Sequence, residues 1–494
     1  MVVLARARGI PAVAVAIAVI HVVLATRYGL HRDELYLLQV GQHAFDGSLD
    51  HSIATPLISR ATQAVLSDSA VALRIVPALL GGGLVVAAAS LCRRLGGDPW
   101  AQWIAAGIVA SSPVFIYTAG VFSTTAIDQL VGAMLSLGAV ALATSNADPR
   151  WWLAMGVIGG VGLANKLTTA LVACSLGVGL AMTPGRKWRR TAWPYLAVAI
   201  AAAFTIPDLV LAPDGPGTWF GMLGRHYAGR LRYVALADFG LGQLADLHVV
   251  GLIAVACAIA RARRDAGTRL VVVSWLVAGV VLLVAHGKHY YWAPWYVGVI
   301  AAGAIPIAGW LRERRAATRL ALVTLFVAST LVAWVATLPL LSAVTSHAVG
   351  LDAVHRELVQ FADWERLVRD LAELRDHAGL PQDTPIVTDS YGTAAAVERY
   401  GPAYGVPPPI SGANSYHVWT RALPARWKIA REATVVMWIG YPDAVRAARC
   451  REQAAIGTLR QGEASNRYDF PRVVYRCELR APLADAWEEL RAFD

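Results

Sequence analysis

Charge is scarce in this chain of 494 residues. Asp, Glu, Lys and Arg together make up 16% of it, whereas 56% of the residues are hydrophobic. The mean hydropathy is +0.48, far above the value of a water-soluble globular domain. This composition excludes a soluble protein and predicts a polytopic α-helical membrane protein.

A signal-peptide cleavage site is also lacking. The first apolar segment, residues 10–25, is followed by Arg27 and Tyr28 rather than by small residues. We therefore interpret this segment as the first membrane span.

Cysteine is rare, with five residues in the chain. Cys92, Cys174 and Cys257 lie in or beside apolar segments, where packing is their expected role. Cys450 and Cys477 both lie in the C-terminal segment. We predict a disulfide between them, because an oxidising compartment permits one, although sequence spacing does not establish its geometry.

Apolar stretches of roughly 17 to 25 residues are long enough to cross a bilayer. The sequence predicts eleven spans, of which the fifth is short and adjoins the sixth. Their approximate bounds are 9–26, 71–91, 100–118, 127–145, 151–164, 166–183, 192–211, 245–260, 269–286, 292–310 and 319–341.

Basic residues occur in alternate connections between these spans, and Lys and Arg concentrate in cytoplasmic loops. With the N-terminus inside, the domain at 1–341 is transmembrane and has outer loops at about 27–70 and 212–244, and residues 342–494 lie outside. The sequence thus predicts a multi-pass protein of the cytoplasmic (inner) membrane. The net charge of +10 then follows from topology, and we expect no nucleic-acid partner.

Two adjacent acids, Asp33 and Glu34, follow the first span in an outer loop that is too long for a simple connection. The apolar spacing from Glu34 to Phe45 predicts a helix along the membrane surface. Asp33 near its N-terminus is either a helix cap or a functional acid, and both interpretations stay open.

Further polar residues lie at the outer ends of later spans. Asp128 opens the fourth span, as a cap or a functional acid, and Lys166 either extends to the interface or serves a site. In the second outer loop, Arg225 and His226 lie among aromatic residues, which is typical of an interfacial anchor or of an anion site.

The third outer turn, AHGKHYYWAPWY, contains Lys288, His289 and Tyr290. A cation at this position would meet a lipid head group or a lipid-linked phosphate. From about residue 342 onward, charges become frequent and three strand-like stretches alternate with helical ones, which predicts an extracytoplasmic α/β domain.

Several of these motifs together resemble the C-type glycosyltransferases. Within them, the chain is similar to the bacterial relatives of dolichyl-phosphate-mannose protein mannosyltransferases (glycosyltransferase family 39) and of lipid A aminoarabinose transferases. The likeness covers nearly the whole chain. It is carried by the Asp33-Glu34 pair and by DSAVALRIVPALLGG, GLANKLTTAL, HGKHYYWAPWY, DSYGTAAAVERYG, PPPISGANSYHVW and APLADAWEELRAF.

The resemblance implies transfer of a sugar, with inversion, from a polyprenyl-phosphate donor to a hydroxyl of a glycan, lipid or protein acceptor at the outer face of the bilayer. It places Asp33 as catalytic base. Glu34 would contact the acceptor or, with Asp33, hold a divalent cation such as Mg or Mn; metal use is left open. Lys288, with His289 and Tyr290, would bind the donor phosphate, helped by Lys166. Arg225, His226 and Asp128 are further substrate-binding candidates.

One stretch departs from the family. Where relatives carry Asp-Gln-Pro-Pro-Leu, an ungapped alignment gives Asp50, His51 and three further residues without the paired prolines. We assign Asp50 and His51 to an acceptor loop, with a surface role for His51 as the alternative. The rival functions are a transporter or flippase for lipid-linked sugars and a binding protein without catalysis. Transporters tend to show paired repeats with broken spans, and the sequence shows no such repeat.

Overall fold

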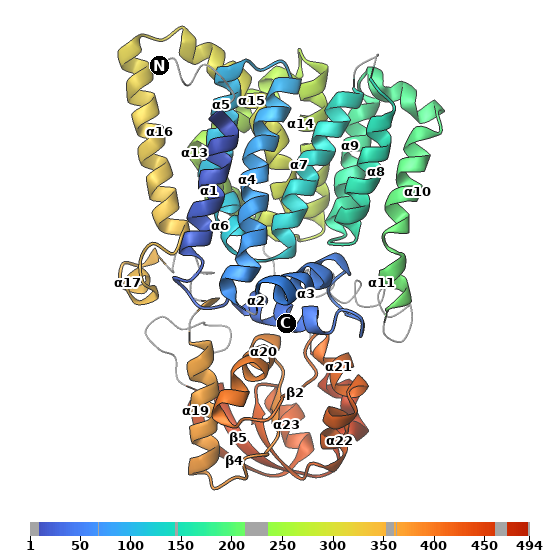
Figure 1. The fold of residues 1–494 in the computed structure, drawn as a ribbon, viewed down its shortest axis with the longest axis vertical. Coiled ribbons are helices and arrows are strands. Elements are labelled where there is room, and N and C mark those ends of the chain that lie inside the picture. Colours follow the sequence, from blue (N-terminus) through green and yellow to red (C-terminus); the bar gives the residue numbers. More distant parts are fainter. Residues whose placement is uncertain are drawn as a thin grey trace.

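The computed structural model describes residues 9–67, 69–143, 147–212, 236–351, 360–361, 363–459 and 472–492. A bundle of long helices forms one end of the molecule, and a small sheet with its own helices forms the other (Figure 1). The predicted fold class, a polytopic helical protein with a C-terminal α/β layer, is confirmed.

The bundle is built from apolar helices that overlap all eleven predicted spans. They are α1 (Ile10–Leu24), α4 (Ala70–Arg94), α5 (Pro99–Ser111), α6 (Pro113–Gly120), α7 (Thr124–Leu142), α8 (Arg150–Leu163), α9 (Thr168–Ala181), α10 (Trp193–Ala203), α11 (Ile206–Val210), α13 (Leu236–Ala262), α14 (Ala266–Val284), α15 (Ala293–Arg312) and α16 (Ala316–Thr337).

The number of spans is not settled by these helices. In the described part of the chain, six helices are long and apolar enough to cross a membrane, or eight if each of two bent pairs counts as one. The α5–α6 pair bends by 62°, where Pro113 starts a new helix, and α9 bends by 114° into the 3-10 helix η3 (Pro184–Arg190). The predicted count of eleven is therefore not confirmed.

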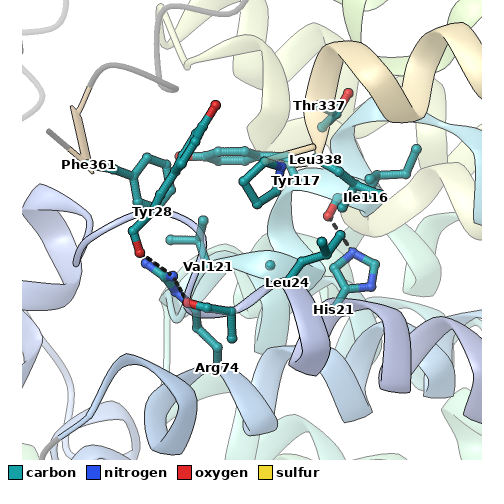
Figure 2. Close-up of a pocket in the computed structure, with 13 residues that line it drawn as sticks. His21, Leu24, Tyr28, Arg74, Ile116, Tyr117, Val121, Thr337, Leu338 and Phe361 are labelled. Carbon is teal, nitrogen blue, oxygen red and sulfur yellow. Dashed lines mark hydrogen bonds between the residues drawn. The ribbon is translucent and has the colours of Figure 1, made fainter. Parts of the chain in front are cut away.

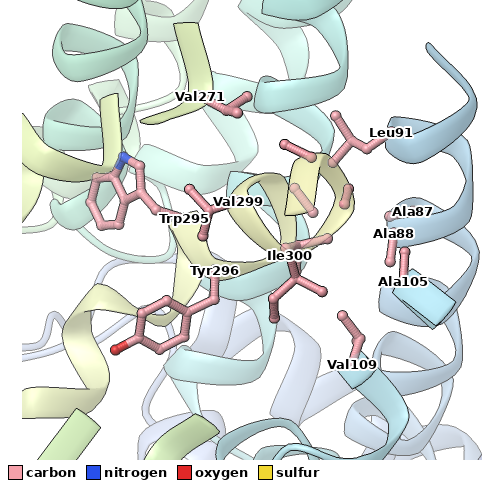
Figure 3. Close-up of a cluster of buried hydrophobic side chains, with 14 of the residues drawn as sticks. Ala87, Ala88, Leu91, Ala105, Val109, Val271, Trp295, Tyr296, Val299 and Ile300 are labelled. Carbon is pink, nitrogen blue, oxygen red and sulfur yellow. The ribbon is translucent and has the colours of Figure 1, made fainter. Parts of the chain in front are cut away.

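Helix α15 lies at the centre of the bundle and packs against α4, α5, α7, α13 and α14. Its Tyr296, Val299 and Ile300 are fully buried among side chains of those helices (Figure 3). At Gly303, a Cβ atom would lie 1.8 Å from the Ala254 carbonyl oxygen, so the absence of a side chain lets α13 and α15 approach closely.

Two short helices, α2 (Arg32–Gln42) and α3 (Ala54–Leu66), lie across the end of the bundle that faces the sheet (Figure 1). Helix α2 occupies the place of the predicted surface helix, whereas α3 has no counterpart in the predicted elements. Ser59 of α3 donates to the Leu37 carbonyl at 2.8 Å, which fastens α3 to α2.

The α/β layer contains five strands in the order β2-β1-β3-β5-β4. β1 pairs in parallel with β2 and β3, and β5 pairs antiparallel with β3 and β4. The elements of the layer are α19 (Trp364–His377), β1 (Ile386–Thr388), α20 (Tyr391–Tyr400), η6 (Gly401–Tyr404), β2 (Ile410–Ser411), α21 (Tyr416–Ala422), α22 (Pro424–Glu432), β3 (Val435–Ile439), α23 (Asp443–Arg449), β4 (Cys450–Leu459), β5 (Arg472–Leu479) and η7 (Leu483–Leu490). Helix α17 (Ala343–Ala348) lies beside the end of α16, apart from the sheet (Figure 1).

A disulfide joins Cys450 of β4 to Cys477 of β5 and so links two strands within the layer. One hydrophobic cluster also runs from α2 into the layer, with Leu35 and Leu38 packed in the same core as Trp364 and Trp419. Because this core is shared, the layer holds a fixed position over the N-terminus of α2.

Candidate functional site

The site is organised around the first turn of α2. His31 is the N-cap residue: its Nδ1 accepts from the Asp33 backbone N–H at 3.1 Å, and its own N–H donates to Glu34 Oε2 at 2.9 Å. This capping box leaves the Asp33 side chain without a capping role, because His31 fills that role. The cap interpretation of Asp33 is therefore wrong.

Glu34 faces the interior, and its carboxylate is occupied. Arg74 of α4 donates to it at 2.6 and 3.0 Å, and the Phe122 backbone N–H donates at 3.0 Å; both side chains of the ion pair are buried. This arrangement contradicts the prediction that Glu34 contacts an acceptor or a cation. Glu34 instead fastens the start of α2 to α4.

Asp33, one residue earlier on the helix, is partly exposed and faces the α/β layer. The hydroxyl of Tyr391, at the start of α20, donates to Asp33 Oδ1 at 2.6 Å. The Arg32 guanidinium lies 4.1 Å from the centre of the Tyr391 ring and donates to its hydroxyl at 3.1 Å. A residue 358 positions away thus orients the candidate base.

The charges around Asp33 favour its carboxylate form. Burial raises the pKa of Asp33, but the electrostatic influence of His31, the Tyr391 hydrogen bond, and the charges of Arg32 and Lys288 outweigh this and bring the pKa below its ordinary value. Asp33 is therefore an ionised base at neutral pH, with a lysine of the third outer turn close enough to act on it.

Two predicted site lysines, Lys288 and Lys166, lie on aromatic rings. Lys288 Nζ is 5.8 Å from the centre of the Tyr290 ring, and Lys166 Nζ is 4.1 Å from that of Tyr291. These two tyrosines belong to one 3-10 helix, η4 (His289–Trp292), so both lysines lie close to η4. The tyrosine faces stabilise cations here without neutralising them.

Asp128 lies deeper, on α7, where it is 1% exposed. It accepts from the Thr168 hydroxyl of α9 at 2.7 Å, and Lys166 acts on it electrostatically. It does not cap its own helix, because α7 begins four residues earlier, at Thr124. Asp128 joins α7 to the segment that carries Lys166.

Asp50 joins the loop before α3 to the α/β layer. Its carboxylate accepts from Tyr36 at 2.8 Å, from Asn414 at 3.0 Å and from Ser415 at 2.6 Å. These hydrogen bonds fasten the loop that contains Asp50 to the α/β layer, and the role of this loop in acceptor binding stays a prediction.

His51 lies beside this junction and is partly exposed. Burial and the positive charge of Lys166 lower the pKa of its imidazole. The negative charges of Asp50, at 3.4 Å, and of the more distant Asp33 raise it by more, so the pKa of His51 lies above its ordinary value. His51 therefore interacts electrostatically with both the candidate base and Lys166.

His289 lies against α13. Its Nδ1 is 3.0 and 3.1 Å from the two carboxylate oxygens of Asp246, a residue that the sequence did not single out. Arg225 and His226 lie outside the described residues.

The residues present do not fit a metal ion at Asp33 and Glu34. Within the described ranges, no three His, Cys, Asp or Glu side chains are grouped as metal ligands would be. Glu34 is already paired with Arg74, which leaves Asp33 as a single ligand.

A cavity of about 30 Å³ lies next to the site, between α1, α6 and the chain after α16 (Figure 2). Its walls are mainly apolar, and Tyr117 in its lining approaches His31 Nε2 at 3.2 Å. It has room for water, and Asp33 is not among its lining residues. The candidate base therefore lies outside this cavity.

Comparison with known proteins places this architecture. A family model described as dolichyl-phosphate-mannose-protein mannosyltransferase matches residues 50–211. The solved structure of ArnT from Cupriavidus metallidurans bound to undecaprenyl phosphate aligns with a TM-score of 0.62 at 13% identity, covering 94% of this chain and 97% of that one. This chain has the fold of the C-type glycosyltransferases.

Two more distant structures share the C-type fold. The Archaeoglobus fulgidus oligosaccharyltransferase in complex with Zn and sulfate aligns with a TM-score of 0.53 at 13% identity, covering 87% of this chain and 67% of that one. The mycobacterial arabinofuranosyltransferase AftD gives 0.52 at 17% identity, covering 95% of this chain and 40% of that longer one. No curated protein matches the sequence. At these identities the solved structures establish the C-type fold.

Sequence reasoning missed several residues that hold the candidate site residues in place. His31, Arg74, Asp246 and Tyr391 each hold a predicted site residue or its neighbour. One signal was present: a buried Arg inside an apolar helix, as at Arg74, requires a buried acid as partner.

Proposed function

We propose that this chain is an inverting glycosyltransferase that moves a sugar from a polyprenyl-phosphate donor to an acceptor hydroxyl at the outer face of the cytoplasmic membrane. One observation carries the proposal: Asp33, ionised and partly exposed, lies within electrostatic reach of Lys288. An acid to take the acceptor proton and a cation for the leaving phosphate are what such a transfer needs.

In the proposed reaction, Asp33 accepts the proton of the acceptor hydroxyl as its oxygen bonds to the anomeric carbon. The bond from that carbon to the phosphate oxygen breaks on the opposite face, and polyprenyl phosphate leaves with the electron pair. Among the described residues, Tyr391 is the one hydrogen-bond donor to the Asp33 side chain, at Oδ1, so Oδ2 remains to receive the proton.

Two lysines would bind the donor phosphate. Lys288 and Lys166 both lie at η4, where the tyrosine rings hold their ammonium groups near the outer end of the bundle. Transfer turns a phosphodiester into a phosphate monoester, which carries more negative charge. Cations fixed at this place stabilise that developing charge. ArnT, a structural relative, has been solved with undecaprenyl phosphate, which supports a donor of this class.

Topology agrees with a reaction on the outer side. The start of α1 and the α15–α16 connection lie at the end of the bundle away from the sheet (Figure 1). That connection contains Arg312, Arg314 and Arg315. Because basic loops stay in the cytoplasm, the α/β layer and Asp33 would face outward.

The test uses purified protein in nanodiscs with a panel of polyprenyl-phosphate sugars, candidate acceptors and water, followed by mass spectrometry of the products. We expect sugar transfer or release with at least one donor. A flippase would move the donor without consuming it, and a binding protein would leave it intact.

Asp33→Asn tests the mechanism. We expect transfer to fall by about 10²- to 10⁴-fold, the usual contribution of a general base. The matched control is Asp46→Asn, the same change at an exposed acid in the loop that follows α2. Undiminished transfer by Asp33→Asn would overturn the mechanism.

A further inference from the structure

A second cavity lies between helix α11 and the chain that joins α2 to α3. Helix α11 lies beside α3, at the end of the bundle that faces the sheet (Figure 1). Residues of the stretch 44–56 form one wall of this α11 cavity, and Asp208 and Leu211 form the other. Its volume is about 10 Å³, close to what one water molecule or one hydroxyl group requires.

Asp208 gives the α11 cavity an acidic wall. Its Oδ1 accepts from the Ile53 backbone N–H at 2.7 Å, and the Ser52 side chain also interacts with it. A carboxylate offers about four acceptor positions, so Asp208 can fasten α11 to the loop and still accept from a ligand. The neighbours of Asp208 in α11 are apolar (IPDLV). An ionisable residue in such surroundings is costly unless it serves a site.

The wall at 44–56 connects the α11 cavity to the proposed reaction. His51, one of its residues, interacts electrostatically with both Asp33 and Lys166. The Ala54 backbone N–H donates to the Ala164 carbonyl at 2.8 Å, and the Thr55 hydroxyl donates to Asn165 at 2.8 Å. This wall is therefore bonded to the turn that leads into Lys166. In the proposed reaction the sugar lies between the acid and the phosphate-binding lysines, which places it beside this wall.

The chemistry of the α11 cavity favours a hydroxyl group as its ligand. A phosphate would be repelled by the Asp208 carboxylate, and a methyl group would leave that carboxylate without a donor. A hydroxyl donates to the carboxylate in a short, charge-assisted hydrogen bond. The cavity has room for such a group but not for a sugar ring, so the ring itself would lie outside.

We propose that the α11 cavity binds one hydroxyl of the donor sugar, with Asp208 as the hydrogen-bond acceptor, and so selects which sugar is transferred. The inference rests on the proposed function and adds a specificity-determining residue to it. A sugar that lacks this hydroxyl, or carries it in the opposite configuration, leaves the carboxylate without its donor. Sites that hydrogen-bond a substrate hydroxyl discriminate strongly against analogues without it.

The test measures binding in nanodiscs of undecaprenyl-phosphate mannose, glucose and arabinose, with bare undecaprenyl phosphate as the sugar-free reference. Asp208→Asn is compared with Asp46→Asn, the same change at an exposed acid in the loop that follows α2. We expect wild type and Asp46→Asn to prefer one sugar lipid, and Asp208→Asn to bind that lipid about 10- to 100-fold more weakly. Binding of bare undecaprenyl phosphate should be equal in all three proteins.

Two further measurements separate ligand binding from a structural role of Asp208. The amide of Asp208→Asn can still accept from Ile53, so hydrogen exchange of the Ile53 amide should match that of the wild type. Ala44→Val fills the α11 cavity from its other wall and leaves Asp208 in place, so it should cause the same selective loss. A monodeoxy form of the preferred sugar lipid should bind weakly to the wild type, and Asp208→Asn should weaken its binding little further.

The outcomes distinguish this inference from the proposed function. Wild-type transfer, together with an unaltered sugar preference in Asp208→Asn, would overturn the inference and leave the proposed function intact. A loss that extends equally to bare undecaprenyl phosphate, or that appears in acceptor KM alone, would also overturn it. Sugar-selective binding that depends on Asp208, without wild-type transfer, would support the cavity and overturn the proposed function.

Discussion

Replacement of Glu34 by Gln tests whether this acid is structural. Glu34 and Arg74 form a buried ion pair, in which their side chains are 0% and 3% exposed. Arg74 donates two hydrogen bonds to the Glu34 carboxylate, at 2.6 and 3.0 Å. The neutral amide of the Glu34→Gln variant would leave Arg74 as a buried charge without a counter-ion, and its N–H groups would oppose those of Arg74. Removal of one partner from such a pair costs about 3–5 kcal/mol.

Thermal unfolding in detergent, followed by tryptophan fluorescence, measures this cost. We expect a clear fall in Tm for Glu34→Gln, whereas Asp33→Asn, a change at the neighbouring and partly exposed acid, should leave Tm near that of the wild type. Substitution of both partners, Glu34→Leu with Arg74→Met, should recover part of the loss, because no lone charge then remains. Recovery is incomplete since Arg74 also donates to the carbonyls of Ala25, Tyr28 and Gly29.

The refuting result is specific. If Glu34→Gln kept the wild-type Tm and still lost transfer, Glu34 would act in the chemistry, and its buried position in this structure would not describe the active state.

Three other predictions concern the α/β layer. Tyr391→Phe removes a hydrogen bond that lowers the pKa of Asp33, so Asp33 should become protonated at a higher pH. A hydrogen bond to a charged group is worth about 1.5–3 kcal/mol, so the acid limb of the kcat profile should move to higher pH by about 1–2 units. An unchanged acid limb would show that Tyr391 does not affect the pKa of Asp33. Ser415→Ala removes the 2.6 Å hydrogen bond from the Ser415 hydroxyl to Asp50 and should weaken the attachment of the loop to the α/β layer by about 1–3 kcal/mol. Backbone amides at 48–51 should then exchange hydrogen faster, and unaltered exchange would show that this hydrogen bond does not hold the loop. Loss of the Cys450–Cys477 disulfide, which closes a separation of 27 residues, should cost about 3 kcal/mol, seen as faster proteolysis of the layer; equal proteolysis of the double Ser variant would contradict this.

Much of the bundle could be predicted, because bilayer thickness dictates the length of an apolar helix. All eleven predicted spans overlap helices of the bundle. The bends could not be placed in the same way. The span predicted at 100–118 is two helices with a break at Ser112, where Pro113 begins a new one, and α9 turns into η3. Proline permits such a break, but packing decides whether the chain uses it.

The candidate site shows a different limit. Asp33 and Glu34 are adjacent in sequence, yet successive residues on a helix point about 100° apart. One acid therefore faces the α/β layer while the other faces Arg74. The sequence presents two equivalent carboxylates and does not reveal which one is turned inward. The partners of Asp50 were hidden for a related reason, since Asn414 and Ser415 lie 364 and 365 positions away.

These contacts make the α/β layer part of the site rather than an addition to it. Tyr391 fixes the orientation of Asp33 and lowers its pKa, and Asn414 and Ser415 fasten the loop that carries His51. The layer also shares a hydrophobic core with α2. A displacement of the layer would therefore remove the Tyr391 hydrogen bond and release the loop at the same time. In the proposed reaction the acceptor hydroxyl reaches Asp33 beside α20, so acceptor entry and the ionisation of the base would both depend on this one interface.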